Sequence, residues 1–394
     1  MPTPTTVTFG TGITYSTGNW PHAVAVVDVN GDGNLDLVTP NEFSGSISVL
    51  LGNGSGSFSS SVSYASGSSP QGIATGDFNK DGKPDIVVSN ASTNQLAVLI
   101  NNGSGGFNSV AKYNVASGPI TVSVADFNSD GNLDIATNSG TVLFGSGNGA
   151  FSGSSSFTSA AGNVIGSADL NGDGKPDIVT SVYNSGINVL LNNGSGNFLT
   201  QSFYNTGAWA VAIGDINSDG KLDIVSANGN SNTVSILLNN GSGNFTISNS
   251  FAAGPRPGWV SIADLNNDNL NDIILAEQGS SQLYILIADG SGGFLAPITC
   301  SLPSMSYFVI AVDINKDQKL DLIAPSAASN LLSVFLNTSI SNNSAPTITS
   351  GSTVSVAENV SSSTAVYTVT ATDPDANTTL TYSISGGVDA NLFN

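Results

Sequence analysis

Residues 28–36 read Asp-Val-Asn-Gly-Asp-Gly-Asn-Leu-Asp, and this stretch decides the fold because the chain repeats its pattern seven times. The shared pattern is D-x-N-x-D-x-x-x-D, with successive copies 49, 49, 43, 46, 49 and 49 residues apart. A period in the forties built from β-type segments is typical of a propeller. The copies begin at Asp28, Asp77, Asp126, Asp169, Asp215, Asp264 and Asp313.

Each copy belongs to a unit that predicts four short strands. In the second unit, the small and apolar residues 72–76 lead into the acidic stretch, and the apolar run 86–88 leaves it. An alternating strand follows at residues 96–100, and an Asn-Asn-Gly-Ser-Gly turn then leads to an outer segment that begins at Phe107. Asn-Gly pairs supply the positive backbone angles of tight hairpins. The predicted fold class is therefore all-β, a seven-bladed β-propeller of four-stranded blades.

The two ends of this repeat region predict how the ring closes. The seventh unit stops at Asn337 without an outer strand, whereas Phe9 and Tyr15 reproduce the six-residue spacing of Phe107 and Tyr113. We therefore expect roughly residues 5 to 17 to complete the last blade, which would leave no exposed sheet edge there. In this interpretation residues 1–337 form the propeller, residues 338–346 a polar linker and residues 347–394 a separate segment.

The acidic stretches are predicted calcium loops. Each copy places side-chain oxygens at positions 1, 3, 5 and 9, with a flexible residue at position 6 and a backbone carbonyl at position 7. Hard Ca²⁺ takes six to eight oxygen ligands, and no copy has the acid at position 12 that an EF-hand requires. The predicted ligands are Asp28, Asn30, Asp32, Asn34, Asp36, Asp77, Asn79, Asp81, Lys83, Asp85, Asp126, Asn128, Asp130, Asn132, Asp134, Asp169, Asn171, Asp173, Lys175, Asp177, Asp215, Asn217, Asp219, Lys221, Asp223, Asp264, Asn266, Asp268, Leu270, Asp272, Asp313, Asn315, Asp317, Lys319 and Asp321.

The charge of the chain supports bound metal. Three aspartates in each of the seven copies make up 21 of the 28 acidic residues, and the net charge is −20. Clustered carboxylates repel one another, and seven Ca²⁺ ions carrying +2 each would bring the net charge to −6. Such acidity also argues against nucleic acid as a partner. The alternative is that these Asp and Asn residues only form turns.

The remaining composition bears on the cellular location of the protein. Cys300 is the only cysteine, so no intrachain disulfide can form, and metal is one way to stabilise an exported protein without disulfides. No run approaches the roughly 20 apolar residues of a membrane helix, so we expect no membrane insertion. The first residues carry no export signal. We nevertheless expect an extracellular or cell-surface location, with any signal lying outside this sequence.

The acidic loops and the Asn-Gly-Ser-Gly-x-Phe turns resemble the FG-GAP or VCBS repeats of integrin α-chain propellers and bacterial surface proteins. The resemblance covers about residues 5 to 337 and implies up to seven calcium ions, one in the loop between the first two strands of each blade. We interpret these repeated ions as a scaffold. Position 6 is Asn269 in the sixth copy and Gln318 in the seventh. Because a left-handed Gln costs about 1 kcal/mol, the seventh site is predicted to be the weakest.

A ligand is expected where the blades differ, since identical sites look structural. The loops on the face opposite the acidic loops carry aromatic and charged residues in the sixth, seventh and first units, which are neighbours in a closed ring. Aromatic faces with a few polar groups suit a carbohydrate or a peptide side chain. The alternative is that the aromatics cap the core and the charges are solvated. The candidate ligand residues are Trp20, His22, Glu42, Arg256, Trp259, Glu277 and Tyr307.

Several functions remain open at this point. The leading hypothesis is a calcium-binding recognition or adhesion module with a protein or glycan ligand at a cell surface. A lectin-like carbohydrate binder and a purely structural surface-assembly subunit are alternatives. We do not expect an enzyme, because His22 is the only histidine and no catalytic motif is present. A polysaccharide-cleaving enzyme would need Glu42 and Glu277 within about 10 Å of each other.

The segment after the linker resembles the first half of a cadherin-like domain. The matching stretches are residues 345–348, 356–359, 372–375 and 382–387. The resemblance implies calcium ligands at Glu358, Asp373 and Asp375. Asn342 and Asn343 stand where the family has Asp-rich ligands, so an inter-domain site is in doubt. Because only about half of such a domain is present, we expect the chain to be part of a larger multi-domain surface protein.

Overall fold

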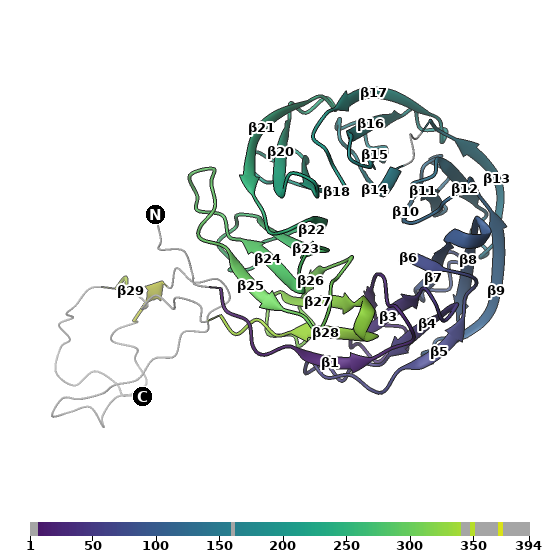
Figure 1. Cartoon of the computed structure of the whole chain (residues 1–394), viewed down its shortest axis with the longest axis horizontal. Helices are drawn as coiled ribbons and strands as arrows, with labels where there is room; N and C mark the ends of the chain where they lie inside the picture. Colours follow the sequence, from purple (N-terminus) through teal and green to yellow (C-terminus); the bar gives the residue numbers. More distant parts are fainter. Residues whose placement is uncertain (1–6, 159–161, 340–346, 351–368, 373–394) are drawn as a thin grey trace, which may run out of the picture. The chain divides into compact units, whose positions relative to one another are not determined.

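The computed structural model of this 394-residue chain describes residues 7–158, 162–339, 347–350 and 369–372. Contacts divide the chain into two compact units, Met1–Ser339 and Ile340–Asn394. The first unit holds seven four-stranded antiparallel sheets, which Figure 1 shows arranged in a ring. The predicted all-β, seven-bladed propeller is confirmed. Blade 1 contains β2–β5, blade 2 β6–β9, blade 3 β10–β13, blade 4 β14–β17, blade 5 β18–β21, blade 6 β22–β25 and blade 7 β26–β28 with β1.

The first two strands of each blade lie nearest the axis of the ring (Figure 1). The innermost strands are β2 (Ala25–Val27), β6 (Pro70–Gly76), β10 (Val122–Ala125), β14 (Gly162–Ala168), β18 (Ala210–Gly214), β22 (Pro257–Ala263) and β26 (Ile310–Val312). The second strands are β3 (Asp36–Asn41), β7 (Asp85–Asn90), β11 (Asp134–Thr137), β15 (Asp177–Val182), β19 (Asp223–Asn228), β23 (Asp272–Glu277) and β27 (Asp321–Ser326).

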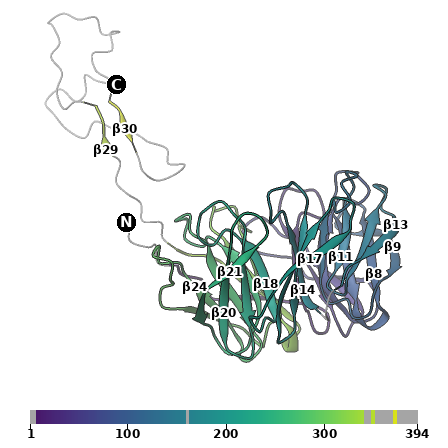
Figure 2. The same cartoon turned by 90° about the horizontal axis from the view of Figure 1, so that it is seen from above.

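The last two strands of each blade form the outer part of the ring, which Figure 2 shows from another side. The third strands are β4 (Ser46–Leu50), β8 (Gln95–Asn101), β12 (Thr141–Gly145), β16 (Gly186–Asn192), β20 (Thr233–Asn239), β24 (Gln282–Leu286) and β28 (Leu331–Phe335). The outermost strands are β5 (Val62–Ala65), β9 (Phe107–Asn114), β13 (Phe151–Ser156), β17 (Phe198–Tyr204), β21 (Phe245–Ala252), β25 (Ile298–Ser301) and β1 (Ile13–Ser16). The short 3₁₀ turns η1 (Ala91–Thr93) and η2 (Ala327–Ser329) link second to third strands.

The ring closes in blade 7, where a strand from the start of the chain completes the sheet. Strand β1 pairs with β28 in antiparallel register, with Ile13 opposite Val334. A further bridge joins Phe9 to Asn337, and the amide of Thr338 donates to the carbonyl of Thr8 at 2.8 Å. The predicted closure by the N-terminal segment is confirmed.

Aromatic pairs join neighbouring blades at the outer edge of the ring. The outer segment of each blade begins with a Phe, and in six blades a second aromatic ring lies six residues later. This second ring contacts the first Phe of the following blade. Tyr64 and Phe107, for example, have centroids 5.3 Å apart at 90°. Such edge-to-face pairs contribute about 0.5–1.5 kcal/mol each beyond their buried area. The six pairs are Tyr15–Phe58, Tyr64–Phe107, Tyr113–Phe151, Phe157–Phe198, Tyr204–Phe245 and Phe251–Phe294.

The boundary between blades 6 and 7 has a different contact. Cys300 stands six residues after Phe294, where the other blades carry a ring. Its thiol is buried in an apolar cluster against which Phe9 packs. This is also the boundary at which the N-terminal segment enters the ring.

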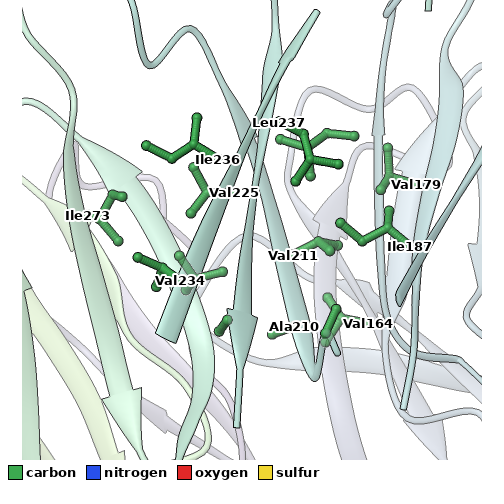
Figure 3. Close-up of a cluster of buried hydrophobic side chains, with 14 of the residues drawn as sticks. Val164, Val179, Ile187, Ala210, Val211, Val225, Val234, Ile236, Leu237 and Ile273 are labelled. Atoms are coloured by element: carbon green, nitrogen blue, oxygen red, sulfur yellow. The ribbon is translucent and has the colours of Figure 1, made fainter. Parts of the chain in front are cut away.

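The core lies between adjacent blades, because the middle strands are apolar on both faces. Figure 3 shows part of one such cluster, in which Val179 and Ile187 of blade 4 and Val225 of blade 5 lie among the buried side chains, as does Ile273 of blade 6. All four side chains are fully buried. β-Branched residues fit the pleated surface of a sheet, so the same residues favour both the strands and their packing.

The second unit is described only in part. The short strands β29 (Thr347–Ile348) and β30 (Ala371–Thr372) pair antiparallel. Glu358, Asp373 and Asp375 lie outside the described residues, so the resemblance to a cadherin-like domain and its calcium ligands stay a prediction. Within the parts of both units that are described, no helix has the length and apolarity needed to cross a membrane.

Closure by β1 can be tested by deletion. Removal of residues 1–17 takes away β1 and leaves β28 as an unpaired edge, and exposed edges pair with other chains. We expect a lower melting temperature and concentration-dependent association in light scattering. Removal of residues 1–6 alone is the matched control, because it keeps β1 and the Phe9 bridge. Equal melting temperatures for the two deletions would contradict the closure.

Candidate functional site

The acidic loops connect the first strand of each blade to the second, and every second strand begins at the position-9 aspartate. In the first loop the carboxylate of Asp28 accepts hydrogen bonds from the amides of Gly31 at 2.7 Å, Asp32 at 3.2 Å and Gly33 at 2.8 Å. The loop thus wraps its backbone amides around its first carboxylate. Equivalent bonds from the amides of positions 5 and 6 occur in all seven loops.

The position-9 carboxylate joins three segments of its blade. In blade 4, one oxygen of Asp177 accepts the amide of Leu170 at 3.0 Å, and the other accepts the amide of Asn192 at 2.8 Å. These contacts connect the loop, the second strand and the end of the third strand. The same pair of bonds is present in every blade, and all seven side chains are fully buried, namely Asp36, Asp85, Asp134, Asp177, Asp223, Asp272 and Asp321.

An asparagine at the end of the third strand connects four of the blades to the blade before. The side-chain amide of Asn192 donates to the carbonyl of Phe127 in blade 3 at 2.9 Å and to that of Pro176 at 3.0 Å. The sequence pattern places Asn192 in an Asn-Asn-Gly-Ser-Gly turn and does not predict this contact between blades. The four asparagines are Asn101, Asn192, Asn239 and Asn337.

Two residues in each loop have left-handed backbone angles. At position 6, φ lies between 65° and 82°, including 65° for Asn269 and 67° for Gln318, which confirms the expected conformation. Position 4 is also left-handed, which the sequence did not predict because no single residue type occupies it. The position-4 residues are Gly31, Lys80, Ser129, Gly172, Ser218, Asn267 and Lys316.

Burial, and to a lesser extent the charges of neighbouring acids, raises the pKa of the position-9 carboxyls. Burial raises the pKa of Asp272 to about 7, and that of Asp134 to about 6. For Asp36, burial is again the main cause of the raised pKa, and the charges of Asp32 and Asp28 raise it further. The three acids of a loop are therefore close enough to repel each other, and a divalent cation would relieve that repulsion.

The chemistry of the donors fits a hard cation. Each loop offers carboxylate, amide and carbonyl oxygens and no sulfur or imidazole, which is the ligand set that Ca²⁺ prefers. Among the described residues, no three acidic, His or Cys side chains already form a metal cluster. Their carboxylates instead accept amides of their own loop. The residues fit calcium in kind and number, and their role as ligands stays a prediction.

A second candidate site lies at the axis, where the innermost strands begin. Each innermost strand ends at its acidic loop, so this site lies on the opposite face of the propeller. A cavity of about 220 Å³ is lined there by residues of all seven blades. We call it the axial mouth. Its lining comprises His22, Ala23, Gln71, Gly72, Ile73, Ile120, Thr121, Val122, Asn163, Val164, Ile165, Tyr183, Trp209, Gly258, Trp259, Gln278, Tyr307 and Phe308.

The lining of the axial mouth has two unlike sides. Blades 5, 6, 7 and 1 contribute most of the rings, and blades 2, 3 and 4 contribute most of the amide and hydroxyl side chains. Two residues cross this division, since Tyr183 of blade 4 places its ring 5.0 Å from that of Trp209, and blade 6 adds the amide of Gln278. We define the aromatic arc as Trp209, Trp259, Tyr307, Phe308 and His22. We define the polar arc as Gln71, Thr121 and Asn163.

The aromatic arc is held together by ring contacts. His22 and Tyr307 stack with centroids 4.8 Å apart and planes at 6°, and Trp259 lies 4.5 Å from Phe308. Burial lowers the pKa of His22 to about 4, so its ring is neutral at physiological pH. The indole N–H of Trp209 donates to the side chain of Asn184.

Of the predicted ligand residues, three meet in the axial mouth and four do not. His22, Trp259 and Tyr307 line the cavity. Trp20 packs on Phe43 with centroids 5.2 Å apart and lies outside the lining.

The predicted charged residues also lie outside the lining. Glu42 accepts the side-chain amide of Gln71 at 2.9 Å. The guanidinium carbon of Arg256 lies 5.1 Å above the ring of Trp209. Glu277 is fully buried, and its carboxylate accepts the hydroxyl of Ser280.

Sequence reasoning missed all three residues of the polar arc, although a signal was present for Gln71 and Asn163. Residues six positions before the first Asp of each copy all line the cavity, and they include Gln71, Asn163 and Trp209 as well as the predicted His22 and Tyr307. Alignment of the copies on that Asp would have placed them in one column.

Comparisons with known proteins agree with this architecture. The description "FG-GAP-like repeat" matches residues 41–88, 77–137, 169–226, 215–275 and 264–324, and "FG-GAP repeat" matches residues 20–57. These matches cover more than half of the chain. The chain belongs to the FG-GAP-like repeat family. Most matches of this FG-GAP-like protein run from one acidic loop to the second strand of the following blade.

Solved structures similar to this FG-GAP-like protein support the fold alone at their low identities. A chain of the BBS1N complex with ARL6DN has a TM-score of 0.59 at 11% identity, over 84% of this chain and 97% of that chain. Inactive virginiamycin B lyase from Staphylococcus aureus, solved with quinupristin, scores 0.56 at 11% identity, over 84% and 99%. An Agrocybe aegerita lectin that recognises terminal N-acetylglucosamine scores 0.50 at 22% identity, over 72% and 81%. No curated protein matches the sequence.

The structural role of the position-9 acid in this FG-GAP-like ring can be separated from metal binding. Asp177→Ala leaves two buried amides without acceptors, and we expect it to destabilise the protein by about 2–4 kcal/mol. Asp173→Ala is the matched control, because Asp173 is an exposed acid in the same loop, and we expect a loss below about 1 kcal/mol. Both are measured by denaturant unfolding in excess chelator. Equal losses would contradict the role of Asp177.

Proposed function

We propose that this FG-GAP-like propeller is an extracellular recognition or adhesion module. Its axial mouth binds a protein or glycan ligand at a cell surface, and calcium in the acidic loops stabilises the ring. The division of the mouth into an aromatic and a polar arc carries the proposal. Among the features described above, only the axial mouth brings together different side chains from seven otherwise similar blades.

The asymmetry argues for a ligand rather than for ring stability. A ring of similar blades needs similar contacts in each repeat. The buried aspartates provide them within every blade, and the outer aromatic pairs provide them at six of the seven boundaries. The column that contains His22, Gln71, Asn163 and Trp209 follows no such rule. Ligand pockets combine apolar walls with a few placed polar groups, and the axial mouth has this composition.

The proposed calcium ions act as a scaffold and take no part in ligand binding. They would occupy the loop ends of the innermost strands, whereas the axial mouth lies at the opposite ends. When bound, calcium supplies the positive charge that offsets three neighbouring carboxylates. In the first loop Asp28, Asn30, Asp32 and Asp36 would hold it through side-chain oxygens, and Asn34 through its carbonyl.

Binding without turnover fits the chemistry of the axial mouth. Glu277, one half of the conceivable acid and base pair with Glu42, has a buried carboxylate directed at Ser280. His22 is stacked on Tyr307, and its lowered pKa makes it a weak base. Burial raises the pKa of the Cys300 thiol to about 11, which keeps it protonated. We therefore propose a recognition role in preference to a polysaccharide-cleaving enzyme.

Calcium binding is tested by elemental analysis together with melting curves. We expect up to seven calcium ions per chain and a clear fall in melting temperature on addition of chelator. The seventh site should be the weakest, since Gln318 is left-handed at φ 67°. Gln318→Gly should tighten it, and Gly82→Gln, at the same position of the second loop, should weaken its own site. A protein without calcium, and with a melting curve unaffected by chelator, would refute the scaffold.

The axial mouth is tested with the full chain on arrays of cell-surface proteins and glycans, in the presence of calcium. We expect at least one ligand whose binding falls about tenfold or more in Trp259→Ala. Phe43→Ala is the matched control, because Phe43 is 62% exposed and lies outside the cavity lining. A ligand that binds both variants like the unmodified protein would place the binding surface elsewhere.

A further inference from the structure

The geometry points to a neutral saccharide as the ligand of the axial mouth. We propose that one sugar ring enters the cavity, stacks on the aromatic arc and forms hydrogen bonds with the side-chain amides of Gln71, Asn163 and Gln278. This inference rests on the proposed function, because it names the ligand class of the same site.

The size of the cavity limits the ligand to one ring. Its volume of about 220 Å³ is below the roughly 300–1,000 Å³ of pockets that enclose drug-sized ligands. A single sugar ring or a single side chain is of the matching size. Larger glycans would therefore extend beyond the cavity over the surrounding surface.

The charge of the lining excludes ionic ligands. No Asp, Glu, Lys or Arg is among the lining residues, and the lowered pKa of His22 makes it neutral. The nearest charged groups, Glu42 and Arg256, contact Gln71 and Trp209 from outside the lining. A charged group that enters the cavity therefore loses its hydration without a direct counter-charge, which weakens its binding. The group that enters must accordingly be neutral, even though the whole chain carries a net charge of −20.

The aromatic arc offers flat apolar surfaces. Trp259 and Tyr307 are each only partly buried, and each has a partner ring, Phe308 or His22, against one side. These partners fix the orientation of the rings, so little rotamer entropy is lost when a ligand binds. The C–H face of a sugar ring is apolar and flat, and it suits such a wall.

The side-chain amides of the lining offer hydrogen-bonding capacity that the protein does not use. The hydroxyl of Thr121, in contrast, already donates to the carbonyl of Asn163 at 3.0 Å and accepts the amide of Ile165 at 3.1 Å. In the described part of the chain, the side-chain amides of Asn163 and Gln278 have no protein partner, and the amide nitrogen of Gln71 alone is engaged, by Glu42. Amides both donate and accept, as hydroxyl groups do. An apolar ligand would displace the water from these groups and give them no partner, which weakens its binding. This capacity favours a sugar over an apolar peptide side chain.

Calorimetry and saturation-transfer NMR on the full chain with calcium test the inference. The probes are neutral methyl glycosides of glucose, galactose, mannose and N-acetylglucosamine, with sialic acid and glucosamine as charged comparisons. We expect one or more neutral glycosides to bind and the charged sugars to bind at least about tenfold more weakly. Trp259→Ala and Asn163→Leu should each weaken binding about tenfold or more, and Phe43→Ala should not. Melting curves establish that each variant is folded.

The outcomes separate this inference from the proposed function. If no neutral glycoside binds while Trp259→Ala abolishes binding of an array protein, the saccharide is wrong and the axial mouth stands. If glycosides bind with unchanged affinity in both Trp259→Ala and Asn163→Leu, sugar is bound elsewhere and the inference fails. Charged sugars that bind as tightly as neutral ones, with the same sensitivity to Asn163→Leu, would also overturn it.

Discussion

The propeller depends on one buried carboxylate that recurs in every blade. At position 9 of each acidic loop, an aspartate such as Asp177 accepts one amide from its loop and another from the end of the third strand. Buried polar groups must find partners, so this side chain sets the path of the loop and the register of two strands at once. Placing it in all seven blades makes the blades alike. Because the seven blades have the same shape, they can close into a ring.

Much of this fold could be predicted from the sequence, because the decisive signals are periodic. The spacing of the acidic stretches gave the number of blades, and the six-residue interval from Phe9 to Tyr15 gave the closing strand. The left-handed position 6 was also predictable, since Gly occupies it in five copies and Asn269 and Gln318 in the other two. Position 4 escaped because Gly, Lys, Ser and Asn all occupy it, and the bond pattern of the loop imposes its conformation there.

The candidate site was harder to predict, because it gathers one or two residues from each blade. Asn163 and Trp209 lie 46 positions apart, and only the geometry of the ring brings them to one cavity. Sequence reasoning selected conspicuous residues, so it included Trp20 and Arg256, which lie outside the lining, and passed over Gln71. The distance along the sequence from a loop residue to the first Asp of its copy determines whether that residue faces the axis. Their chemical prominence says little about it.

The closing blade also determines how the propeller would carry mechanical load. Residues 8 and 338 are hydrogen-bonded neighbours, so both ends of the ring leave it at one place. Tension between these two ends would peel β1 away from β28 one residue pair at a time, starting at the bridge between Phe9 and Asn337. A pull between the axial mouth and the segment after Ser339 would instead run through β28 and the strands beside it. A propeller loaded in that way keeps its closing strand out of the line of force.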